Sequence, residues 1–319
     1  MNKILEHVGL MGILPVAIVE DETKAVQLGQ ALCEGGLRTI EVTFRTSAAA
    51  HVIERIAASS LDMLIGAGTV LTIDQARTAI EAGARFIVSP GFNPKVVEYC
   101  IANSVPVIPG VMTPTEIQYA IEYNLEVVKF FPAESAGGLE YLKAIAAPFK
   151  EMRFIPTGGI DESTLLPYLR FPQVLACGGS WMMKSELIES GQFNEIVQLT
   201  HQAVTTMLGF ELRHIGMNLP NATDAERIAA TIKKTFDLEV RDTSGSFFVG
   251  TQFEVLKFQH LGTHGHIAIG THFIDRAIAY LALRGIGIKP ETKNIKDGKL
   301  STVYLDIEIA GFAIHLVQL

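Results

Sequence analysis

One lysine interrupts an apolar run that otherwise reads as a strand buried on both faces. Lys129 lies between Val128 and Phe130 in "LEVVKFFPAESAGG". Burying an ammonium is costly unless the charge is paired or the proton is lost. A strand-end lysine can extend its amine to solvent, whereas a lysine kept neutral by burial can attack a carbonyl carbon. The local sequence leaves both interpretations open.

A carboxylate and a guanidinium share one face of another predicted strand. Side chains alternate across a strand, so Glu41 and Arg45 of "IEVTFRT" point to the same side. By the same alternation, Lys129 shares a face with Phe131. If both faces line one interior, an acid and an amine converge in a pocket suited to proton transfer and nucleophilic attack. The alternative is a buried Glu–Lys ion pair that serves packing alone.

Glycine pairs follow two later apolar runs. "PTGGI" contains Gly158 and Gly159, and "CGGSW" contains Gly178 and Gly179, followed by Ser180. Without a Cβ, backbone N–H groups at such positions can approach an anion closely. One pair alone is also explained by a tight turn. Two pairs in consecutive loops predict a phosphate site.

The elements that must position these residues are eight short apolar runs alternating with amphipathic stretches. The runs are "ILPVAIV", "RTIEVTF", "MLIGAGTV", "RFIVSPG", "VPVIPGV", "EVVKFFPA", "RFIPTGG" and "VLACGGS". Helices are predicted after Thr72 and after Thr113, where Pro114 takes the first helical position, and Gly83 should stop one helix. Eight βα units predict a closed (β/α)8 TIM barrel over residues 1–209, with its chemistry at the C-terminal strand ends.

After Phe210 the alternation gives way to an internal repeat. A strand in "RHIGMNL", a helix from about Ala222 to Phe236 and short strands through "FEVLKF" come first. A strand in "HGHIAIGT", a helix in "FIDRAIAYLALRG" and strands in "STVYLDIEI" and "FAIHLVQL" repeat that order. Residues 210–319 are therefore predicted to form a smaller α+β domain of paired βαβββ modules.

Composition excludes several classes of function. A formal charge of −8 without any basic cluster argues against nucleic-acid binding and favours small-molecule partners. The three cysteines show no CxxC spacing, which fits a reducing compartment. The first residues read as a helix and a strand rather than a signal peptide, and no apolar run reaches the roughly 18 residues that span a bilayer. We expect a cytoplasmic protein without membrane contact.

Seven motifs in order resemble the KDPG/KHG aldolase family: "EVTFRT", "GAGTVL", "SPGFNP", "PGVMTPTE", "KFFPAE", "PTGGI" and "GGSWM". The resemblance covers Met1 to about Gly209. It implies a class I aldolase that needs no cofactor and assembles as a homotrimer. The implied reaction cleaves 2-keto-3-deoxy-6-phosphogluconate (KDPG) to pyruvate and glyceraldehyde 3-phosphate. The related 4-hydroxy-2-oxoglutarate (KHG) would give pyruvate and glyoxylate, and the sequence does not choose among phosphogluconate, phosphogalactonate and unphosphorylated substrates.

The same resemblance assigns roles to single residues. Lys129 would form the Schiff base and Glu41 would act as general acid and base. Arg45 and Thr69 would hold the pyruvyl carboxylate. The residues that would hold the phosphate are Gly158, Gly159, Gly179 and Ser180. The residues that would line the rest of the pocket are Pro90, Phe131 and Thr157.

The C-terminal repeat resembles the vicinal oxygen chelate superfamily, which includes glyoxalase I. The positions that correspond to its metal ligands are His214, Glu254, His266 and His315. Such a set suits Zn, Fe, Mn, Co or Ni without choosing among them, and the last position is more often glutamate in that superfamily. The alternative is a domain that has lost its metal and serves assembly or ligand binding. The region's other histidines are expected on the surface or in loops: His260, His264 and His272.

Two other functions fit the same residues. In one, the barrel is a phosphate-anchored epimerase or synthase that does not need Lys129, and the C-terminal domain is a metal-dependent lyase or dioxygenase. In the other, the C-terminal domain is a non-catalytic sensor of a sugar-acid metabolite.

Overall fold

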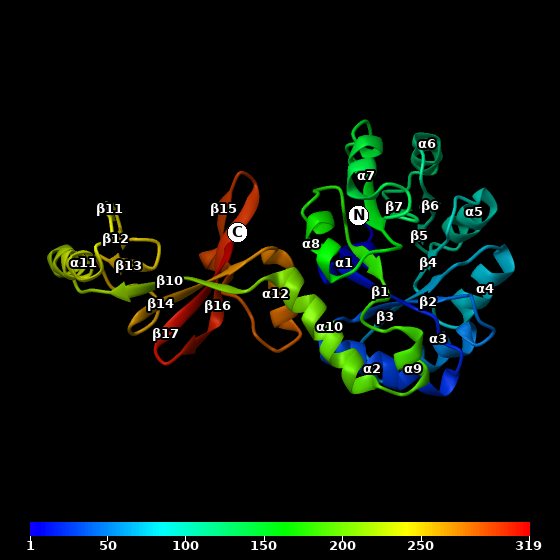
Figure 1. Cartoon of the computed structure of the whole chain (residues 1–319), viewed down its shortest axis with the longest axis horizontal. Helices are drawn as coiled ribbons and strands as arrows, with labels where there is room; N and C mark the ends of the chain where they lie inside the picture. The colour runs from blue at the N-terminus through cyan, green and yellow to red at the C-terminus, as the bar shows by residue number, and fades with distance from the viewer. The chain divides into compact units, whose positions relative to one another are not determined.

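The computed structural model describes residues 1–319, which form two compact units, Met1–Met207 and Leu208–Leu319 (Figure 1). The division lies two residues before the predicted boundary at Gly209. None of the helices combines the length and the hydrophobicity that crossing a bilayer requires.

The first unit alternates short strands with helices. Its strands are β1 (Ile13–Ala17), β2 (Thr39–Thr43), β3 (Leu64–Gly68), β4 (Phe86–Val88), β5 (Val107–Ile108), β6 (Gly110–Val111), β7 (Val127–Phe130), β8 (Arg153–Pro156) and β9 (Cys177–Gly179). Its helices are α1 (Lys3–Met11), α2 (Ala25–Gly35), α3 (Ala49–Ala57), α4 (Ile73–Glu81), α5 (Pro94–Ala102), α6 (Pro114–Glu122), α7 (Gly138–Ala146), α8 (Glu162–Leu169), α9 (Ser185–Glu189) and α10 (Phe193–Leu208), with a 3-10 turn at Glu22–Lys24.

Parallel pairing links these strands into an α/β barrel. One sheet has the order β5-β4-β3-β2-β1-β9 and the other the order β6-β7-β8. β5 and β6 flank Pro109 and occupy one strand position, since proline has no N–H for the ladder. On the other side, a parallel bridge from Thr157 to Gly178 joins the end of β8 to β9. The eight predicted runs thus supply eight strand positions, and only "VPVIPGV" is divided.

Apolar side chains fill one end of the barrel. The buried cluster there consists of Leu5, Val8, Leu14, Phe86, Val88, Ile108, Val127, Ile155 and Ala176. Leu5 and Val8 come from α1, which precedes β1 and so covers the N-terminal strand ends. A Cβ on Gly66 would lie 2.2 Å from the Phe86 ring, so glycine makes room for that ring. The opposite end, where the strands finish, is left for ionisable residues.

The helix boundaries follow the predicted local signals. The Thr72 side chain accepts a hydrogen bond from the Gln75 N–H at 3.2 Å and caps α4. Thr113 and Glu116 form a reciprocal capping box at the start of α6, with Pro114 in its first turn. Gly83 follows α4 with φ 109°, a left-handed conformation that favours glycine. These three predictions are confirmed.

The second unit contains one sheet and two α-helices. Its strands are β10 (Glu211–Asn218), β11 (Val240–Asp242), β12 (Ser246–Val249), β13 (Phe253–Leu256), β14 (Gly265–Thr271), β15 (Asn294–Lys296), β16 (Lys299–Ile309) and β17 (Phe312–Gln318). Its helices are α11 (Ala222–Phe236) and α12 (Ile274–Ala282), with a 3-10 turn at Pro290–Thr292. The chain therefore runs twice through the order strand, helix and three strands, as predicted.

The sheet of the second unit has the order β11-β12-β13-β10-β14-β17-β16-β15. β10 pairs antiparallel with β14, and each of these pairs parallel with the last strand of its own half. α11 packs Ala225 and Ala229 against Val249 and Val255 on one face of the first half. Because side chains alternate, Glu254 lies on the other face of that half.

Candidate functional site

Lys129 and Glu41 meet in the interior of the barrel, at the end where the strands finish. Lys129 Nζ lies 3.3 Å from Glu41 Oε1, and the two side chains are only 7% and 1% exposed. The Lys129 amine also lies 5.2 Å from the centre of the Phe131 ring. The second carboxylate oxygen, Glu41 Oε2, is buried and has no partner. An incompletely paired buried carboxylate beside an amine leaves an acceptor for a proton from a bound molecule.

Glycine on the neighbouring strand creates the space for this carboxylate. Gly68 lies opposite Thr43 in the β2–β3 register, and a Cβ on it would lie 2.1 Å from Glu41 Oε1. The backbone of Lys129 is held by the strand on its other side, because its main-chain N–H donates to the carbonyl of Pro109 at 2.9 Å. The sequence predicted the shared faces of Glu41 and Lys129 and singled out "GAGTVL", which contains Gly68, but it did not show that Gly68 makes room for the Glu41 carboxylate.

Arg45 and Thr69 lie together just beyond the ends of β2 and β3. Arg45 Nε donates to Thr69 Oγ1 at 3.3 Å, and Arg45 is exposed. Thr69 has φ 54°, a left-handed conformation that is uncommon for a non-glycine residue and often occurs at functional sites. Pro90 follows β4. Its carbonyl oxygen packs so closely on Gly110 that a Cβ on Gly110 would lie 2.0 Å from this oxygen.

The first glycine pair forms an open turn after β8. Gly158 and Gly159 have φ 98° and 85°, and their N–H groups donate no hydrogen bond to any acceptor in the chain. Thr157 is buried, with its hydroxyl against Gly178, where a Cβ would lie 2.3 Å from Oγ1. Two free N–H groups on consecutive left-handed residues suit an anion.

The second glycine pair ends β9. Gly179 is buried and Ser180, which follows it, is exposed and has a free backbone N–H. The ring of Trp181 lies over Gly179, where a Cβ would come within 1.9 Å of it. The bridge between Thr157 and Gly178 brings the two glycine pairs together at neighbouring strand ends.

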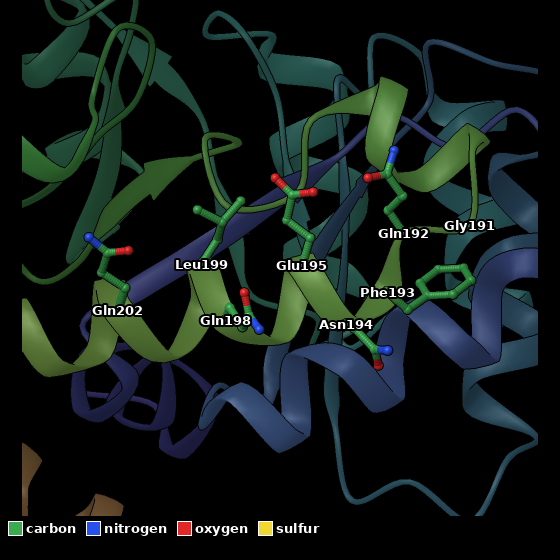
Figure 2. A pocket seen from close by; sticks show the side chains of 8 residues that line it. All are labelled: Gly191, Gln192, Phe193, Asn194, Glu195, Gln198, Leu199 and Gln202. Atoms are coloured by element: carbon green, nitrogen blue, oxygen red, sulfur yellow. The ribbon is translucent and has the colours of Figure 1, made fainter.

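A hollow elsewhere on the first unit has no comparable chemistry. Figure 2 shows it at the start of α10, where eight residues line it: Gly191, Gln192, Phe193, Asn194, Glu195, Gln198, Leu199 and Gln202. The lining contains no cation, its one ionisable side chain is Glu195, and none of the predicted site residues belongs to it. We assign it no function.

Four predicted ligand residues converge on one face of the second unit's sheet. His214 Nε2 lies 3.1 Å from His266 Nε2, and Glu254 Oε2 lies 3.2 Å from each of these nitrogens. One ring nitrogen of His315 lies within 4.8 Å of those of the other two histidines. A Cβ on Gly216 would lie 2.1 Å from the His266 ring, so glycine makes room for this imidazole.

The close contacts in this cluster cannot all be hydrogen bonds at once. If the Nε2 atoms of His214 and His266 both carry protons, each can donate to Glu254, but the two N–H groups then point at one another without an acceptor between them. If only one Nε2 atom is protonated, the other histidine has no hydrogen bond to Glu254. His266 Nδ1 and both ring nitrogens of His315 are buried without partners. Burial and then the charges of His266 and His214 lower the pKa of His315 to about 3, so this imidazole is neutral at neutral pH.

Glu254 is the anion of the cluster. Burial would raise the pKa of its carboxyl group, but hydrogen bonds with His214, His266 and Ser246 outweigh that effect, and the pKa is lowered. Ser246 Oγ donates to Glu254 Oε1 at 2.7 Å and leaves Oε2 directed at the histidines. An ionised carboxylate and neutral imidazoles are the ligand forms that a divalent metal requires.

Two aromatic side chains border the cluster and carried no signal in the sequence. Tyr304 stacks on His315 with ring centres 4.8 Å apart, and Phe248 meets His214 edge-on at 5.7 Å. Burial and then the charge of Glu254 raise the pKa of Tyr304 to about 12, so the phenol stays protonated and can donate a hydrogen bond. The register between neighbouring strands places both rings beside the histidine cluster, and the spacing of residues along the sequence does not reveal this register.

The other histidines of this unit stay outside the cluster. His260 and His264 are exposed, and His272 is partly exposed. His264 packs against Phe312, with ring centres 5.6 Å apart. The prediction that these three are surface or loop residues is confirmed.

The α/β barrel and its first site define an enzyme class. A buried amine beside a carboxylate at the C-terminal strand ends can form an imine with a ketone and move the protons this requires. Free N–H groups on the glycine turns can receive an anionic part of the same molecule. These are the parts of a lyase that works through a lysine Schiff base.

Known proteins match the first unit. Residues 4–199 match the family of KDPG and KHG aldolases. The 2-dehydro-3-deoxy-phosphogluconate aldolase of Treponema pallidum is 48% identical over 204 residues, which are 64% of this chain and 97% of that protein. The chain therefore belongs to the KDPG and KHG aldolase family and is an aldehyde-lyase.

Solved structures agree with this membership. A KDPG aldolase from Legionella pneumophila, with pyruvate captured as a covalent carbinolamine intermediate, has a TM-score of 0.60 and 35% identity, covering 62% of this chain and 97% of that one. The KDPG aldolase of Zymomonas mobilis with 3-phosphoglycerate has the same TM-score and identity, covering 64% of this chain and 95% of that one.

Proposed function

We propose that the first unit cleaves KDPG to pyruvate and glyceraldehyde 3-phosphate through a Schiff base on Lys129, and that it also accepts KHG. The observation that carries this proposal is the buried contact of 3.3 Å between Lys129 Nζ and Glu41 Oε1 in a barrel of this family. The carbinolamine captured in the Legionella pneumophila enzyme supports covalent chemistry with pyruvate in a related site.

The cleavage follows from the two side chains. The neutral Lys129 amine attacks the C2 ketone to form a carbinolamine, Glu41 gives a proton to its hydroxyl group, and water leaves. The iminium that remains accepts the electron pair when the C3–C4 bond breaks, while the C4 hydroxyl proton passes to Glu41 directly or through a water. The enamine then takes a proton at C3, and water hydrolyses the imine to release pyruvate and free Lys129.

The remaining pocket residues bind the ends of the substrate. Arg45 and Thr69, already joined by a hydrogen bond, hold the carboxylate of the pyruvyl end. The free N–H groups of Gly158, Gly159 and Ser180 hold the phosphate. Aromatic and apolar surface from Pro90 and Phe131 shields the imine carbon. The buried hydroxyl of Thr157 adds a hydrogen-bonding group. Gly179, which has no Cβ, lets the end of β9 come close to the phosphate.

Reductive trapping tests this function. Incubation with pyruvate and sodium borohydride should add one reduced pyruvyl group to Lys129, detected by peptide mass spectrometry. The variant Lys129→Ala should lose both the adduct and the aldolase activity. Lys150→Ala removes an exposed lysine of the same unit and should behave like the wild type. A wild-type adduct at another lysine, or an active Lys129→Ala variant, would contradict the proposal.

Substrate comparison tests the phosphate site separately. The value of kcat/KM should be higher for KDPG than for the unphosphorylated analogue, because the glycine turns bind the phosphate in both ground and transition states. Equal values would show that these turns do not anchor the substrate.

We further propose that the second unit binds one divalent metal ion through His214, Glu254, His266 and His315, in a fold of the vicinal oxygen chelate type. Ligand atoms about 2.1 Å from one ion lie about 3.0–3.4 Å apart at angles of about 90–109°. The contacts of 3.1 and 3.2 Å among His214, His266 and Glu254 agree with this spacing. The unpartnered nitrogens of His315 supply the fourth ligand after a small ring movement.

When bound, this ion would act as a Lewis acid toward an oxygen-bearing ligand at an open position. We assign it no part in carbon–carbon cleavage at Lys129. Elemental analysis of protein purified without chelators should find one ion per chain, and His266→Ala should lose it. His264→Ala changes an exposed histidine outside the cluster and is the matched control. No stoichiometric metal, even after addition of Zn, Mn, Fe, Co or Ni, would mean that the unit serves only as a scaffold or ligand-binding module.

The same proposal includes the setting of the enzyme. We infer that the chain works in the cytoplasm as a homotrimer, on the basis of its resemblance to the aldolase family. The three cysteines form no disulfide bond with one another, which supports a reducing compartment. Analytical ultracentrifugation would measure the oligomeric state.

A further inference from the structure

The loop that follows the lysine strand is tied to the first glycine turn. The N–H of Ala133 donates to the carbonyl of Thr157 at 2.8 Å, and the N–H of Glu134 donates to the carbonyl of Gly158 at 3.0 Å. These bonds continue the β7–β8 pairing beyond its last strand pair, Phe130 with Pro156. They occupy the carbonyl groups of Thr157 and Gly158, while the N–H groups of Gly158 and Gly159 remain free.

The side chain of Glu134 packs on this turn and is held from behind. A Cβ on Gly159 would lie 2.6 Å from the Cβ of Glu134, so the glutamate occupies the space that glycine leaves. Glu134 Oε1 accepts a hydrogen bond of 2.6 Å from Tyr168 Oη. Tyr168 lies on α8 and is 1% exposed. One bond therefore connects the loop after β7 to the helix that follows the turn.

The chemistry of this pair fits positioning better than direct contact with the substrate. A carboxylate beside a phosphate site repels the phosphate, so Glu134 is a poor choice for binding it. Burial, and then the hydrogen bond and charge of Glu134, raise the pKa of Tyr168, so its phenol remains a donor at neutral pH. Hydrogen bonds to a charged group are stronger than neutral ones.

We propose that Glu134 and Tyr168 are positioning residues for the phosphate end of the substrate, which hold the Thr157–Gly159 turn in a fixed place relative to Lys129. This role rests on the proposed aldolase function and on its phosphate site. Neither residue touches the reacting atoms. Loss of the bond lets the turn move, which weakens phosphate binding but leaves imine formation at Lys129 intact.

The variant Tyr168→Phe keeps the buried ring and removes the donor. We expect KM for KDPG to rise about tenfold, since a hydrogen bond to a charged group is lost. Kinetics with unphosphorylated KHG and borohydride trapping of pyruvate should stay at wild-type levels. Titration with inorganic phosphate, followed by the fluorescence of the chain's single tryptophan, Trp181, should show a matching loss of affinity.

Two further variants keep the test decisive. Glu134→Gln removes the charge but keeps an oxygen that can accept the hydrogen bond from Tyr168. Its KM for KDPG should therefore lie between the values of the wild type and of Tyr168→Phe. If Tyr168→Phe does not fold, Glu134→Gln preserves the fold and still tests the role of the pair. Tyr123→Phe breaks another Tyr–Glu bond of the same unit, 2.8 Å to Glu98, and should change nothing. It controls for losing such a bond at the surface.

The outcomes separate this role from the function on which it rests. Wild-type KM and phosphate affinity in Tyr168→Phe and Glu134→Gln, or equal losses with KDPG and KHG, would overturn the positioning role and leave the aldolase intact. A wild-type enzyme without an adduct on Lys129 would instead overturn the proposed function.

Discussion

Replacing Gly68 by alanine should disable the aldolase site while the barrel still folds. A Cβ at this position would lie 2.1 Å from Oε1, 2.6 Å from Cγ and 2.7 Å from Cδ of Glu41. Gly68 does not have a positive φ, so its backbone accepts alanine without strain. The whole effect of the substitution therefore falls on the Glu41 carboxylate and its contact with Lys129.

The size of the effect follows from the distances. Ordinary contact with a Cβ begins near 3.4 Å, so the Glu41 carboxylate must move by more than 1 Å from its position at 2.1 Å. A misplacement of about 1 Å can cost about 100-fold in rate. Inserting a methyl group into a packed interior costs about 1–3 kcal/mol. A barrel of this size should then melt roughly 2–12 °C lower and remain folded at 25 °C.

The assay couples pyruvate release from KDPG to NADH oxidation by lactate dehydrogenase. We expect kcat to fall about 100-fold in Gly68→Ala. Gly91→Ala is the control, because a Cβ on Gly91 would meet nothing within 4 Å. Thermal melting of each variant separates lost activity from lost fold. A folded Gly68→Ala enzyme with wild-type kcat would refute the role given to the Glu41 carboxylate.

Two further predictions concern the second unit and the barrel helices. In Gly216→Ala the new Cβ would lie 2.1 Å from the His266 ring, so metal affinity, measured by competition with a chelating dye, should fall about 10- to 100-fold. Gly245→Ala, whose nearest atom would be 3.5 Å away, should bind metal normally. Asp161 caps α8, and hydrogen bonds from the Ser163 side chain and then the Thr164 N–H lower its pKa. Because the folded pKa lies below the unfolded value of about 3.9, this stability is present above pH 4 and disappears as pH falls through the folded pKa. Asp161→Ala should cost about 1 kcal/mol at pH 7 by urea unfolding, and the charge-dependent part of that cost should disappear once the pH lies below the folded pKa.

Much of the fold is predictable from the sequence because the signals are local. The caps at Thr72 and Thr113 act within one helical turn, and both helices begin where these residues predict. Eight apolar runs gave the strand positions, although the break at Pro109 divides one of them. The βαβββ order of the second unit could be predicted for the same reason.

For the candidate sites, the sequence predicted the residues and the faces that carry them, but the contacts between them depend on the tertiary structure. Alternation placed Glu41 and Lys129 on interior faces, and the repeat placed four ligand-type residues on equivalent strands. The distance of 3.3 Å between two side chains 88 residues apart depends on the closure of the barrel. The sequence did not reveal the pair of Glu134 with Tyr168, because their contact joins a loop to a helix.

The sequence by itself therefore determined which residues could do chemistry and which face of each strand carries them. Periodicity and capping depend on residues that are close in the sequence, so they can be recognised without the tertiary structure. Only the tertiary structure decided which glycines leave space for Glu41 and His266, and which side chains border the histidine cluster. Those contacts depend on strand register and barrel closure, which bring together atoms that no sequence spacing relates.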